Sequence, residues 1–586
     1  MPDKTFETDI SNVLYINLTT KTSKVERRQE LYDRCIGGTG VATKLMLEEF
    51  KEGTDSLEPD APVIMAIGPL SGIYPCCTKV VSMFRSPLTD EFGESHAGGR
   101  LAMAMRFAGY GAIVITGRAE RPVYLAIHNN DIAFKDASSI WGLSSTTDIG
   151  KILRTVEPAT GKRSIIRIGV AGEKGIKYAN VNVDTYRHFG RLGLGAVFGA
   201  KNLKAIVISG DKEVNVPDIN TYNNVYKKLY DQIVKTDLME KYHNLGTSEN
   251  ILPLNELSGL PTRNLQQSFF EYADTISGEI FADNYLIRKI SCANCPIGCI
   301  HIAMLKTAFA PSHEFEVIHV SYDYELLYAL GTNLGILTPE GILELIDRCE
   351  RYGVDIISMG VVLAWATEMS MQKRISSDDT LGVSLKWGDI KSYLRAIDLV
   401  IESPNEFYSA LANGVVFASK KYGGEEFAIQ AGGLEIPGYH TGLGNIIGLT
   451  GGVRHSHLDN AGYSADQKAF KNSLSDEEII DLLIYQDDLR GVLNSLTICL
   501  FSQAIYTYDT IIEALEAIGI KKSKNELMKL GRDIFMAKYK LKRKFGFSLD
   551  DVKFPSRFFE TATTNGMIDE KRVQKALEMY RVKRGI

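Results

Sequence analysis

The chain has 586 residues, of which 45% are apolar and 24% are charged. Its 66 Lys and Arg residues nearly balance its 72 Asp and Glu residues, which leaves a net charge of −6 at pH 7. This apolar content excludes a mainly disordered chain. The small net charge argues against a nucleic-acid-binding protein, which usually carries a basic face. At roughly 100–200 residues per domain, the length predicts about three or four domains.

The sequence predicts neither a membrane span nor a secretion signal. No apolar run reaches the roughly 18 residues that a transmembrane helix needs. Residues 1–13 are polar and acidic, and they lack the charged-then-apolar layout of a secretory signal. We therefore expect a cytoplasmic protein in which the cysteines form no disulfide framework.

The first 210 residues have the pattern of a β-rich region. Gly, Pro, Asp and Asn separate short β-favouring runs. These runs are residues 13–18, 63–67, 112–116, 123–127, 164–170 and 204–209. Helical patterns at 39–50 and 99–107 lie between them. The sequence thus predicts a β-rich N-terminal domain over residues 1–214, covered by a few helices.

Helical patterns dominate beyond Pro217. Segment 221–242 is polar, helical in period and free of Gly and Pro. Segment 339–352 follows Thr338, an N-cap, and Gly353 stands at its C-terminal end, which is a good pair of start and stop signals. Further helices are predicted at 476–486 and 506–517. The predicted fold class is α+β, in which the β-rich domain is followed by two mainly α-helical domains, 215–425 and 426–586.

The strongest local signal is the C-x2-C-x3-C run of Cys292, Cys295 and Cys299. A fourth ligand must come from elsewhere, and both Cys499 and Cys349 are available. The second C-x2-C unit or the spaced histidine pair of a zinc site is not visible. We therefore favour a [4Fe–4S] cluster, with a structural zinc ion as the alternative. The remaining cysteines are expected to be buried or incidental thiols: Cys35, Cys76 and Cys77.

Two glycine-rich segments favour anion binding. Segment 190–204, which begins at Gly190, and segment 68–100 both combine glycines with basic side chains. Closely spaced glycines let backbone N–H groups approach a phosphate. The residues before Gly190 do not have the pattern of a strand end, so a dinucleotide loop is weakly supported and a tight turn into a helix is the alternative. Together the segments suggest a large phosphate-bearing ligand.

These motifs together resemble the aldehyde:ferredoxin oxidoreductase family of tungsten enzymes over nearly the whole chain. The segments that carry the resemblance are, in order, NVLYINLTT, IGGTGVATKLM, GPLSG, RSPLTDEFGES, GGRLAMAMRFAGYGAIVITG, GRLGLGAVFGAKNLKAI, CANCPIGC and GLEIPGY. The resemblance implies a β-rich base below two helical domains. It also implies a tungsten or molybdenum ion held by two molybdopterin-type pterins, a Mg²⁺ ion bridging the pterin phosphates, and a [4Fe–4S] cluster beside one pterin.

Two family motifs of the form Asp-x-x-Gly-Leu-(Asp or Cys) hold the pterins. The resemblance places the first on residues 350–355 and the second on residues 494–499, and it selects Cys499 as the fourth cluster ligand. Both motifs depart from the family pattern, because Glu, Asn and Thr replace expected Asp and Gly residues. The cofactor-binding residues implied here are Glu350, Gly353, Asp355, Asn494 and Thr497.

The resemblance places further cofactor-binding residues in the N-terminal domain. Lys79 aligns with a family arginine, so the charge is kept but the bidentate fork is lost. His96 aligns with an asparagine, and Arg187-His188 aligns with an Arg-Ala pair near the pterin phosphates. Gly190 opens the glycine-rich segment that follows.

The resemblance also implies the acid–base groups. The family's catalytic glutamate falls on Glu325, and a glutamate enclosed beside a metal can act as a base. Without the resemblance, a solvated acid at a helix start is the simpler interpretation. A histidine near the metal is expected in segment 454–457, where we favour His457 and keep His455 as the second candidate.

Three functions follow as hypotheses. The first is oxidation of a small-molecule aldehyde to a carboxylic acid, with electrons leaving through the cluster to ferredoxin or a small iron–sulfur subunit. The second is the catalytic subunit of a tungsten-dependent benzoyl-CoA reductase complex, which would take an aromatic acyl-CoA. The third, of another class, is a non-catalytic iron–sulfur electron-transfer subunit. An oligomer is expected, without nucleic acid as a partner.

Overall fold

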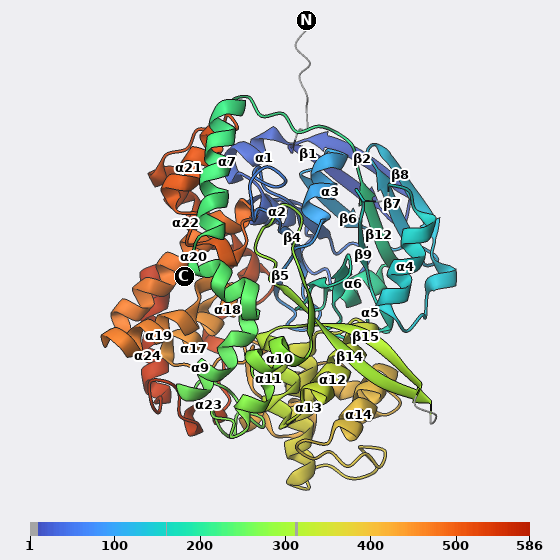
Figure 1. Cartoon of the computed structure of the whole chain (residues 1–586), viewed down its shortest axis with the longest axis vertical. Coiled ribbons are helices and arrows are strands. Elements are labelled where there is room, and N and C mark those ends of the chain that lie inside the picture. Colours follow the sequence, from blue (N-terminus) through green and yellow to red (C-terminus); the bar gives the residue numbers. More distant parts are fainter. Residues whose placement is uncertain (1–9, 160, 311–313) are drawn as a thin grey trace, which may run out of the picture.

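The computed structural model describes residues 10–159, 161–310 and 314–586, so most of the polar N-terminal segment lies outside the described residues. Figure 1 shows three parts: β-sheets from the N-terminal third, a helical part from the middle of the chain, and a second helical part from its C-terminal third. The α+β fold class predicted from the sequence is therefore confirmed, whereas the domain boundaries stay predictions.

The N-terminal part contains two six-stranded sheets. The first has the order β2 (Thr22–Arg27), β1 (Asn12–Asn17), β6 (Ala112–Thr116), β3 (Val63–Ala66), β4 (Val80–Arg85) and β5 (Phe92–Ala97). The second has the order β11 (Arg187–Phe189), β10 (Val181–Val183), β9 (Ser164–Arg167), β12 (Leu203–Ser209), β7 (Val123–His128) and β8 (Asp131–Asp136). Each predicted β-favouring run overlaps one of these strands. The run at 164–170 is shorter than predicted, because α5 begins at Val170.

The inner strands of the first sheet, β1, β6, β3 and β4, are largely buried on both faces, whereas the edge strand β2 is exposed. In β1, Val13 packs with α2 and the C-terminal helices, whereas Leu14 packs into the core between the two sheets. Both side chains have 0% exposure. Burial on both faces explains why these strands are nearly continuous apolar runs without polar alternation. The covering helices of this part are α1 (Gln29–Cys35), α2 (Gly38–Glu49), α3 (Leu101–Ala108), α4 (Thr146–Val156), α5 (Val170–Glu173) and α6 (Leu194–Ala200).

The middle helices include one prediction that holds and one that is wrong. Helix α12 spans Pro339–Tyr352 as predicted, with Thr338 capping its start and Gly353 left-handed after its end. The single helix predicted over 221–242 is instead broken, because α7 (Ile219–Val234) ends where the Thr236 hydroxyl bonds the Ile233 carbonyl. The other middle helices are α8 (Asp237–Met239), α9 (Ile251–Glu256), α10 (Gly278–Asn284), α11 (Tyr324–Leu330), α13 (Ile356–Met371), α14 (Ile390–Glu402), α15 (Glu406–Ala412) and α16 (Val415–Tyr422).

The C-terminal helices cover the outer face of the first sheet. The predicted helix at 476–486 extends further, as α20 (Asp476–Ser495), and Ser475 and Glu478 close its start as a capping box. The others are α17 (Leu443–Gly451), α18 (His457–Asn460), α19 (Gly462–Asn472), α21 (Tyr508–Ala517), α22 (Lys524–Lys544), α23 (Arg557–Glu560) and α24 (Glu570–Arg584). Across the described residues, we find no helix with the length and apolar content needed to span a bilayer.

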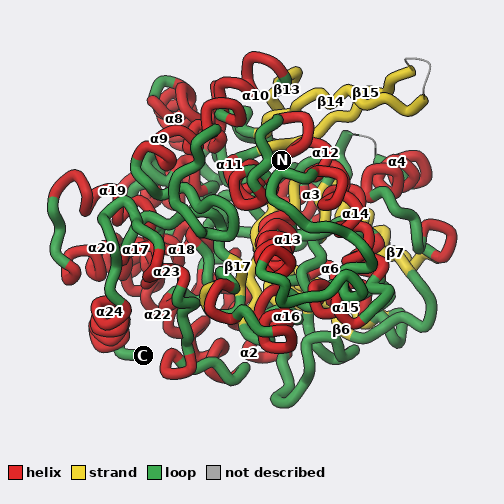
Figure 2. Tube along the Cα trace, turned by 90° about the horizontal axis from the view of Figure 1, so that it is seen from below, coloured by secondary structure: helices red, strands yellow, loops and turns green. Residues whose placement is uncertain are grey.

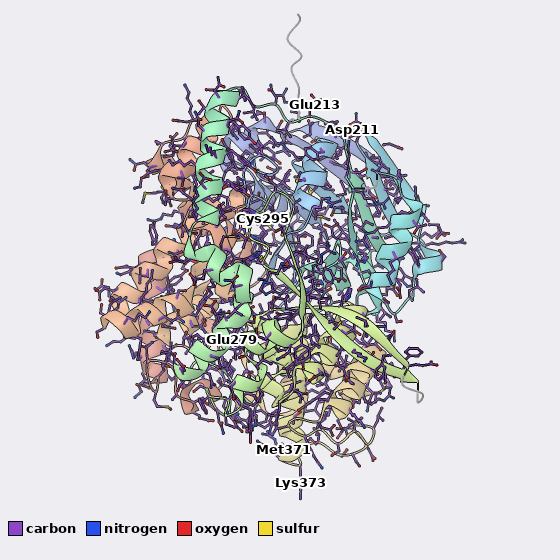
Figure 3. The ribbon with its side chains drawn as sticks, viewed as in Figure 1. Asp211, Glu213, Glu279, Cys295, Met371 and Lys373 are labelled. Carbon is purple, nitrogen blue, oxygen red and sulfur yellow. The ribbon has the colours of Figure 1, made fainter. Side chains whose placement is uncertain are left out.

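A three-stranded sheet carries the cysteine run. Its strands are β13 (Leu286–Ile290), β14 (Ile300–Ala310) and β15 (Glu314–Tyr322), and β14 pairs with both neighbours. Figure 2 shows the β14–β15 hairpin extending away from the body of the molecule. The cysteine run is the connection between β13 and β14, so the inner end of this sheet holds the cysteines in place. Cys295 lies near the centre of the molecule in the view of Figure 3.

Candidate active site

A cavity of about 550 Å³ lies where the three parts of the chain meet. It takes side chains from the N-terminal sheets, from the ends of α11 and α12, and from the C-terminal loops. Of the residues predicted from the sequence, those that line it are His96, Arg187, His188, Gly190, Cys299, Glu325, Glu350, Asp355 and His457. The cavity thus gathers residues separated by hundreds of positions in the sequence.

Glu325 is held at the cavity wall by two hydrogen bonds. The Tyr439 hydroxyl donates to Glu325 Oε1 at 2.9 Å, and His457 Nε2 lies 3.1 Å from the same oxygen. Because an ionised carboxylate only accepts, His457 carries a proton on Nε2. His457 is the first residue of α18, and Glu325 lies in the first turn of α11. The geometry joins a carboxylate, an imidazole and a phenol in one contact.

Asp323, the N-cap of α11, also lines the cavity. Burial and then the charge of Glu325 raise the pKa of Asp323 to about 7. Burial opposes ionisation of Glu325 as well, but hydrogen bonds from His457 and Tyr439 hold the pKa of Glu325 below its ordinary value. At neutral pH, one carboxyl group of this pair is therefore ionised while the other is able to carry a proton. Such a separation of pKa values is what acid–base chemistry requires.

Residues 350–355 comprise the last turn of α12 and the short loop that connects it to α13. His188 Nε2 lies 2.8 Å from Glu350 Oε2, and Arg191 Nε donates to Asp355 Oδ2 at 3.0 Å. Asp355 also caps α13 by accepting from the Ile357 amide. The side chains of this loop that face the cavity are therefore already fixed by partners from the N-terminal part.

Residues 494–499 comprise the end of α20 and the loop after it, and they do not line the cavity. The Thr497 hydroxyl and the Ser71 hydroxyl lie 2.7 Å apart, and the Lys79 amide donates to the Thr497 carbonyl at 3.2 Å. Asn494 is nearly buried, with 9% exposure. This loop is thus tied to the glycine-rich segment at 68–100.

The cysteines of the run and Cys499 lie around two partly buried cations, Lys79 and Arg187. The backbone amide of Gly99 donates to Cys292 Sγ at 3.2 Å, and Arg187 Nη2 approaches Cys299 Sγ at 4.0 Å. Burial opposes the charge of Lys79, but the thiols of Cys499 and Cys292 raise its pKa above the ordinary value.

Gly98 keeps the space between these groups clear. A Cβ atom at this position would lie 2.7 Å from Cys292 Sγ and 3.5 Å from Lys79 Nζ. Positive charges and amide donors around thiolates suit an anionic iron–sulfur group.

The structure also separates the two candidates for the fourth cysteine. Cys499 shares an apolar cluster with Cys295 and Cys299, whereas Cys349 lies in α12 within the core of the middle part. In the described residues, no three His, Cys, Asp or Glu side chains converge closely enough to bind a single metal ion.

The two histidines of segment 454–457 have different surroundings. His457 lines the cavity, whereas His455 is not among the lining residues. His455 Nε2 instead lies 3.1 Å from Glu91 and 2.9 Å from the Lys542 amine, in a buried ionic cluster. His455 is thus placed to join the C-terminal helices to the first sheet.

His96 faces the cavity and is paired with Glu94, its Nε2 lying 2.6 Å from Glu94 Oε1. Burial lowers the pKa of His96 to about 4, so its imidazole is neutral at physiological pH. Because its one N–H, on Nε2, donates to the Glu94 carboxylate, the neutral ring keeps Nδ1 as an acceptor for a ligand. The asparagine that the resemblance led us to compare with His96 also offers an acceptor, through its amide oxygen.

Sequence reasoning missed three residues that shape the site. Tyr439 ends the quoted segment GLEIPGY, and Asp323 lies two positions before Glu325, but spacing alone assigns no role to either side chain. Arg191, one of the basic side chains of segment 190–204, anchors Asp355 and the carbonyl of Glu435. In the sequence, only the position of Tyr439 at the end of GLEIPGY could have pointed to it.

One more expectation about the glycine-rich segment is wrong. Residues 187–189 form β11 directly before Gly190, and α6 follows, so a strand does precede this segment. However, β11 is an edge strand that pairs antiparallel with β10. The segment is therefore not part of a parallel βαβ dinucleotide fold.

Three buried polar atoms at the cavity wall have no hydrogen-bond partner among the described residues. They are Asn180 Oδ1, Arg187 Nε and His457 Nδ1. An unpartnered buried polar atom costs about 1–3 kcal/mol. These atoms therefore fit a polar ligand such as a pterin, whose ring edge offers both donors and acceptors.

Comparisons with known families identify the class of protein. The family described as "Aldehyde ferredoxin oxidoreductase, N-terminal domain" matches residues 13–210, and "Aldehyde ferredoxin oxidoreductase, domains 2 & 3" matches residues 224–586. The chain therefore belongs to the aldehyde ferredoxin oxidoreductase family, and it is an oxidoreductase. The resemblance stated from the motifs is confirmed.

Individual relatives agree with this family. The tungsten-containing aldehyde ferredoxin oxidoreductase of Pyrococcus furiosus is 33% identical over 573 residues, covering 94% of this chain and 91% of that protein. The enzyme of the same name from Thermococcus kodakarensis is 32% identical, covering 94% and 92%. A solved structure, the active-site complex BamBC of benzoyl-coenzyme A reductase with 1,5-dienoyl-CoA, matches with a TM-score of 0.83. At 18% identity over 99% of this chain and 94% of that chain, it shows a shared fold.

Proposed function

We propose that this chain oxidises aldehydes to carboxylic acids at a tungsten ion held by two molybdopterin-type pterins. The observation that carries the proposal is the contact of Glu325 with His457 and Tyr439 in a cavity that also reaches Cys299. Acid–base groups and the start of an electron path thus share one chamber. The relatives at 32–33% identity, named as aldehyde ferredoxin oxidoreductases, support this choice of substrate class.

The cofactor would lie among residues of both helix-end loops and of the N-terminal part. At the cavity, Glu350 and Asp355 offer oxygens to pterin N–H groups, and His96, Arg187 and His188 lie on its N-terminal side. Asn494 does not line the cavity, and only the resemblance assigns it to the cofactor. When bound, the tungsten–pterin group supplies a two-electron acceptor. A bridging Mg²⁺ ion at the pterin phosphates remains part of the proposal.

The protein's own groups then manage protons. An aldehyde becomes a carboxylic acid by gaining a water oxygen while two electrons and two protons leave. Ionised Glu325 is placed to accept a proton from water, and His457 and Tyr439 hold the carboxylate in position. Asp323, with its raised pKa, can exchange a proton nearby. Cys292, Cys295, Cys299 and Cys499 would hold a [4Fe–4S] cluster, which would supply a path for single electrons to ferredoxin or a small iron–sulfur subunit.

A second candidate is the catalytic subunit of an aromatic acyl-CoA reductase. His96 and His188, which depart from the family pattern as we compared it, both line the cavity, so the chemistry there can differ from that of typical members. The shared fold with the benzoyl-coenzyme A reductase complex is compatible with this alternative and does not establish it. The third hypothesis, a non-catalytic subunit, is less favoured because Glu325 and its two partners form a complete acid–base contact. The cytoplasmic location and the oligomeric state stay predictions.

The first experiment is elemental analysis of protein purified without oxygen, followed by substrate assays. We expect about one tungsten and about four irons per chain, together with pterin phosphorus. The loaded protein is then given aliphatic and aromatic aldehydes with a viologen dye as acceptor, and benzoyl-CoA with a reduced viologen as donor. Aldehyde-dependent dye reduction supports the proposal. Ring reduction without aldehyde oxidation selects the second candidate, and iron without tungsten or pterin in native-host protein overturns both.

A further inference from the structure

Residues 74–79 bridge the two cysteine-bearing segments. The Cys76 amide donates to the Asn294 carbonyl at 3.0 Å, and the Cys499 amide donates to the Cys76 carbonyl at 2.9 Å. Asn294 lies inside the cysteine run, and its side-chain amide also donates to the Tyr74 carbonyl at 2.9 Å. The backbone of Cys76 is thus fixed by hydrogen bonds to both segments that carry the proposed cluster ligands.

The thiol of Cys76 points toward one of those ligands. Cys76 Sγ lies 3.6 Å from Cys295 Sγ, within hydrogen-bond distance for sulfur, and the Cys76 side chain has 0% exposure. The adjacent Cys77 is also buried, but its thiol donates to the Tyr506 hydroxyl at 3.6 Å. Of two consecutive cysteines, one therefore contacts a proposed ligand sulfur and the other contacts a tyrosine.

We propose that Cys76 donates a hydrogen bond to the sulfur of Cys295 and thereby raises the reduction potential of the cluster. The inference rests on the cluster ligation in the proposed function. A cysteine bound to iron is a thiolate and has no proton to donate, so Cys76 is the donor of this pair. Cys76 itself stays a neutral thiol and acts through Cys295, without contact to substrate.

The direction of the effect follows from charge. The reduced cluster carries one more negative charge than the oxidised cluster, and much of that charge lies on its sulfurs. A donor aimed at a ligand sulfur stabilises the reduced form more, and such hydrogen bonds are among the factors that set cluster potentials. Burial strengthens the effect, because water does not screen the contact. We expect removal of the donor to lower the equilibrium constant for reduction of the cluster roughly tenfold, which lowers the midpoint potential by about 59 mV for a one-electron couple.

The test measures the midpoint potential of the cluster by redox titration followed by electron paramagnetic resonance in the full holoenzyme. The variants are Cys76→Ala, which removes the donor, and Cys76→Ser, which keeps one. Cys77→Ala is the matched control, because it removes a buried thiol one position away that does not contact Cys295. Iron is counted in every sample. If Cys76→Ala retains less iron than wild type, Cys76→Val, which fills the volume without a donor, takes its place.

The inference requires a lower midpoint potential in Cys76→Ala than in wild type, with Cys76→Ser closer to wild type and Cys77→Ala unchanged. An unchanged potential in Cys76→Ala at full iron content overturns it, as does an equal fall in Cys77→Ala. Failure of the proposed function gives a different result: in that case the wild-type protein itself contains no iron, so there is no cluster whose potential could be measured. Pulsed resonance spectra after exchange into D₂O add a second readout, in which an exchangeable hydrogen coupled to the reduced cluster is lost in Cys76→Ala.

Discussion

The loops that end at Asp355 and at Cys499 share a backbone form and differ in chemistry. In each, a helix ends, a residue takes a left-handed conformation, and the functional side chain follows two positions later; the left-handed residues are Gly353 at φ +74° and Thr497 at φ +58°. Asp355 is held by Arg191 at the cavity, whereas Cys499 lies with the cysteine run. The turn sets where the last side chain lies, and the identity of that side chain decides whether it offers a carboxylate or a thiolate.

The largest effect, on iron content, is expected when the last residue of each loop is replaced by alanine. Cys499→Ala removes one of four proposed iron ligands, so the iron content and the visible absorbance of the cluster should fall to near zero, and aldehyde turnover with them. Asp355→Ala, at the equivalent position of the other loop, should keep its iron. Both are measured by iron analysis and absorbance on anaerobically purified protein. Equal iron in wild type and Cys499→Ala would remove Cys499 from the ligand set.

Substitutions at Glu325 and its partner His457, which lie outside both loops, should separate catalysis from cofactor binding. Glu325→Gln keeps the size of the side chain and loses the base, so turnover should fall about 10²–10⁴-fold while tungsten and iron remain. His457→Asn should also slow turnover, since it removes one hydrogen bond to Glu325. His455→Asn is the matched control, because this histidine is not in the cavity. Steady-state rates with the metal content of each variant decide, and full activity in Glu325→Gln would refute the role.

Much of the fold could be predicted because its signals are local. The caps of α12 and the apolar runs of the N-terminal strands mark their elements without help from the rest of the chain. The break after α7 could not be predicted, because a lone Thr236 whose hydroxyl bonds the Ile233 carbonyl is a weak signal in a polar helical segment. Short edge strand β11 was missed for a related reason, since pairing with β10 and not residue preference defines it.

Only those residues of the candidate site that lie within or beside a family motif could be predicted from the sequence. Residues inside a motif, such as Glu325 and Asp355, could be named from the chain. Partners that arrive from another part of the molecule could not, as with Tyr439, which meets Glu325 across 114 positions. The same limit applies to Cys76, expected as an incidental thiol and found 3.6 Å from Cys295 across 219 positions. Contacts of this kind depend on tertiary packing, which spacing in one sequence does not encode.

The carboxyl pair predicts how stability changes with pH. The pKa of Asp323 rises from 3.8 to about 7 on folding, so the folded protein holds an extra proton between these values. The stability contributed by that proton is complete below about pH 4 and is lost as the pH rises toward about 7, at no more than about 1.4 kcal/mol per pH unit. Asp323→Asn, which can still cap α11, should flatten this slope. Urea denaturation of both proteins at several pH values provides the test, and parallel curves would contradict it.

The smallest effects, on the free energy of unfolding, are expected when each left-handed residue is replaced by the residue at the equivalent position of the other loop. In Gly353→Thr, a β-branched residue must adopt φ +74°, and its Cβ would lie 2.9 Å from the Gly169 amide nitrogen, so we expect a loss of at least about 2 kcal/mol. In Thr497→Gly, relief of the left-handed strain is offset by loss of the Ser71 contact and by added chain entropy, so the change should stay within about 1 kcal/mol. Denaturant unfolding of the two variants compares them. If Thr497→Gly is destabilised as strongly as Gly353→Thr, then side-chain contacts, and not the backbone turn, hold the second loop in place. The two loops would then share a backbone shape that different interactions stabilise.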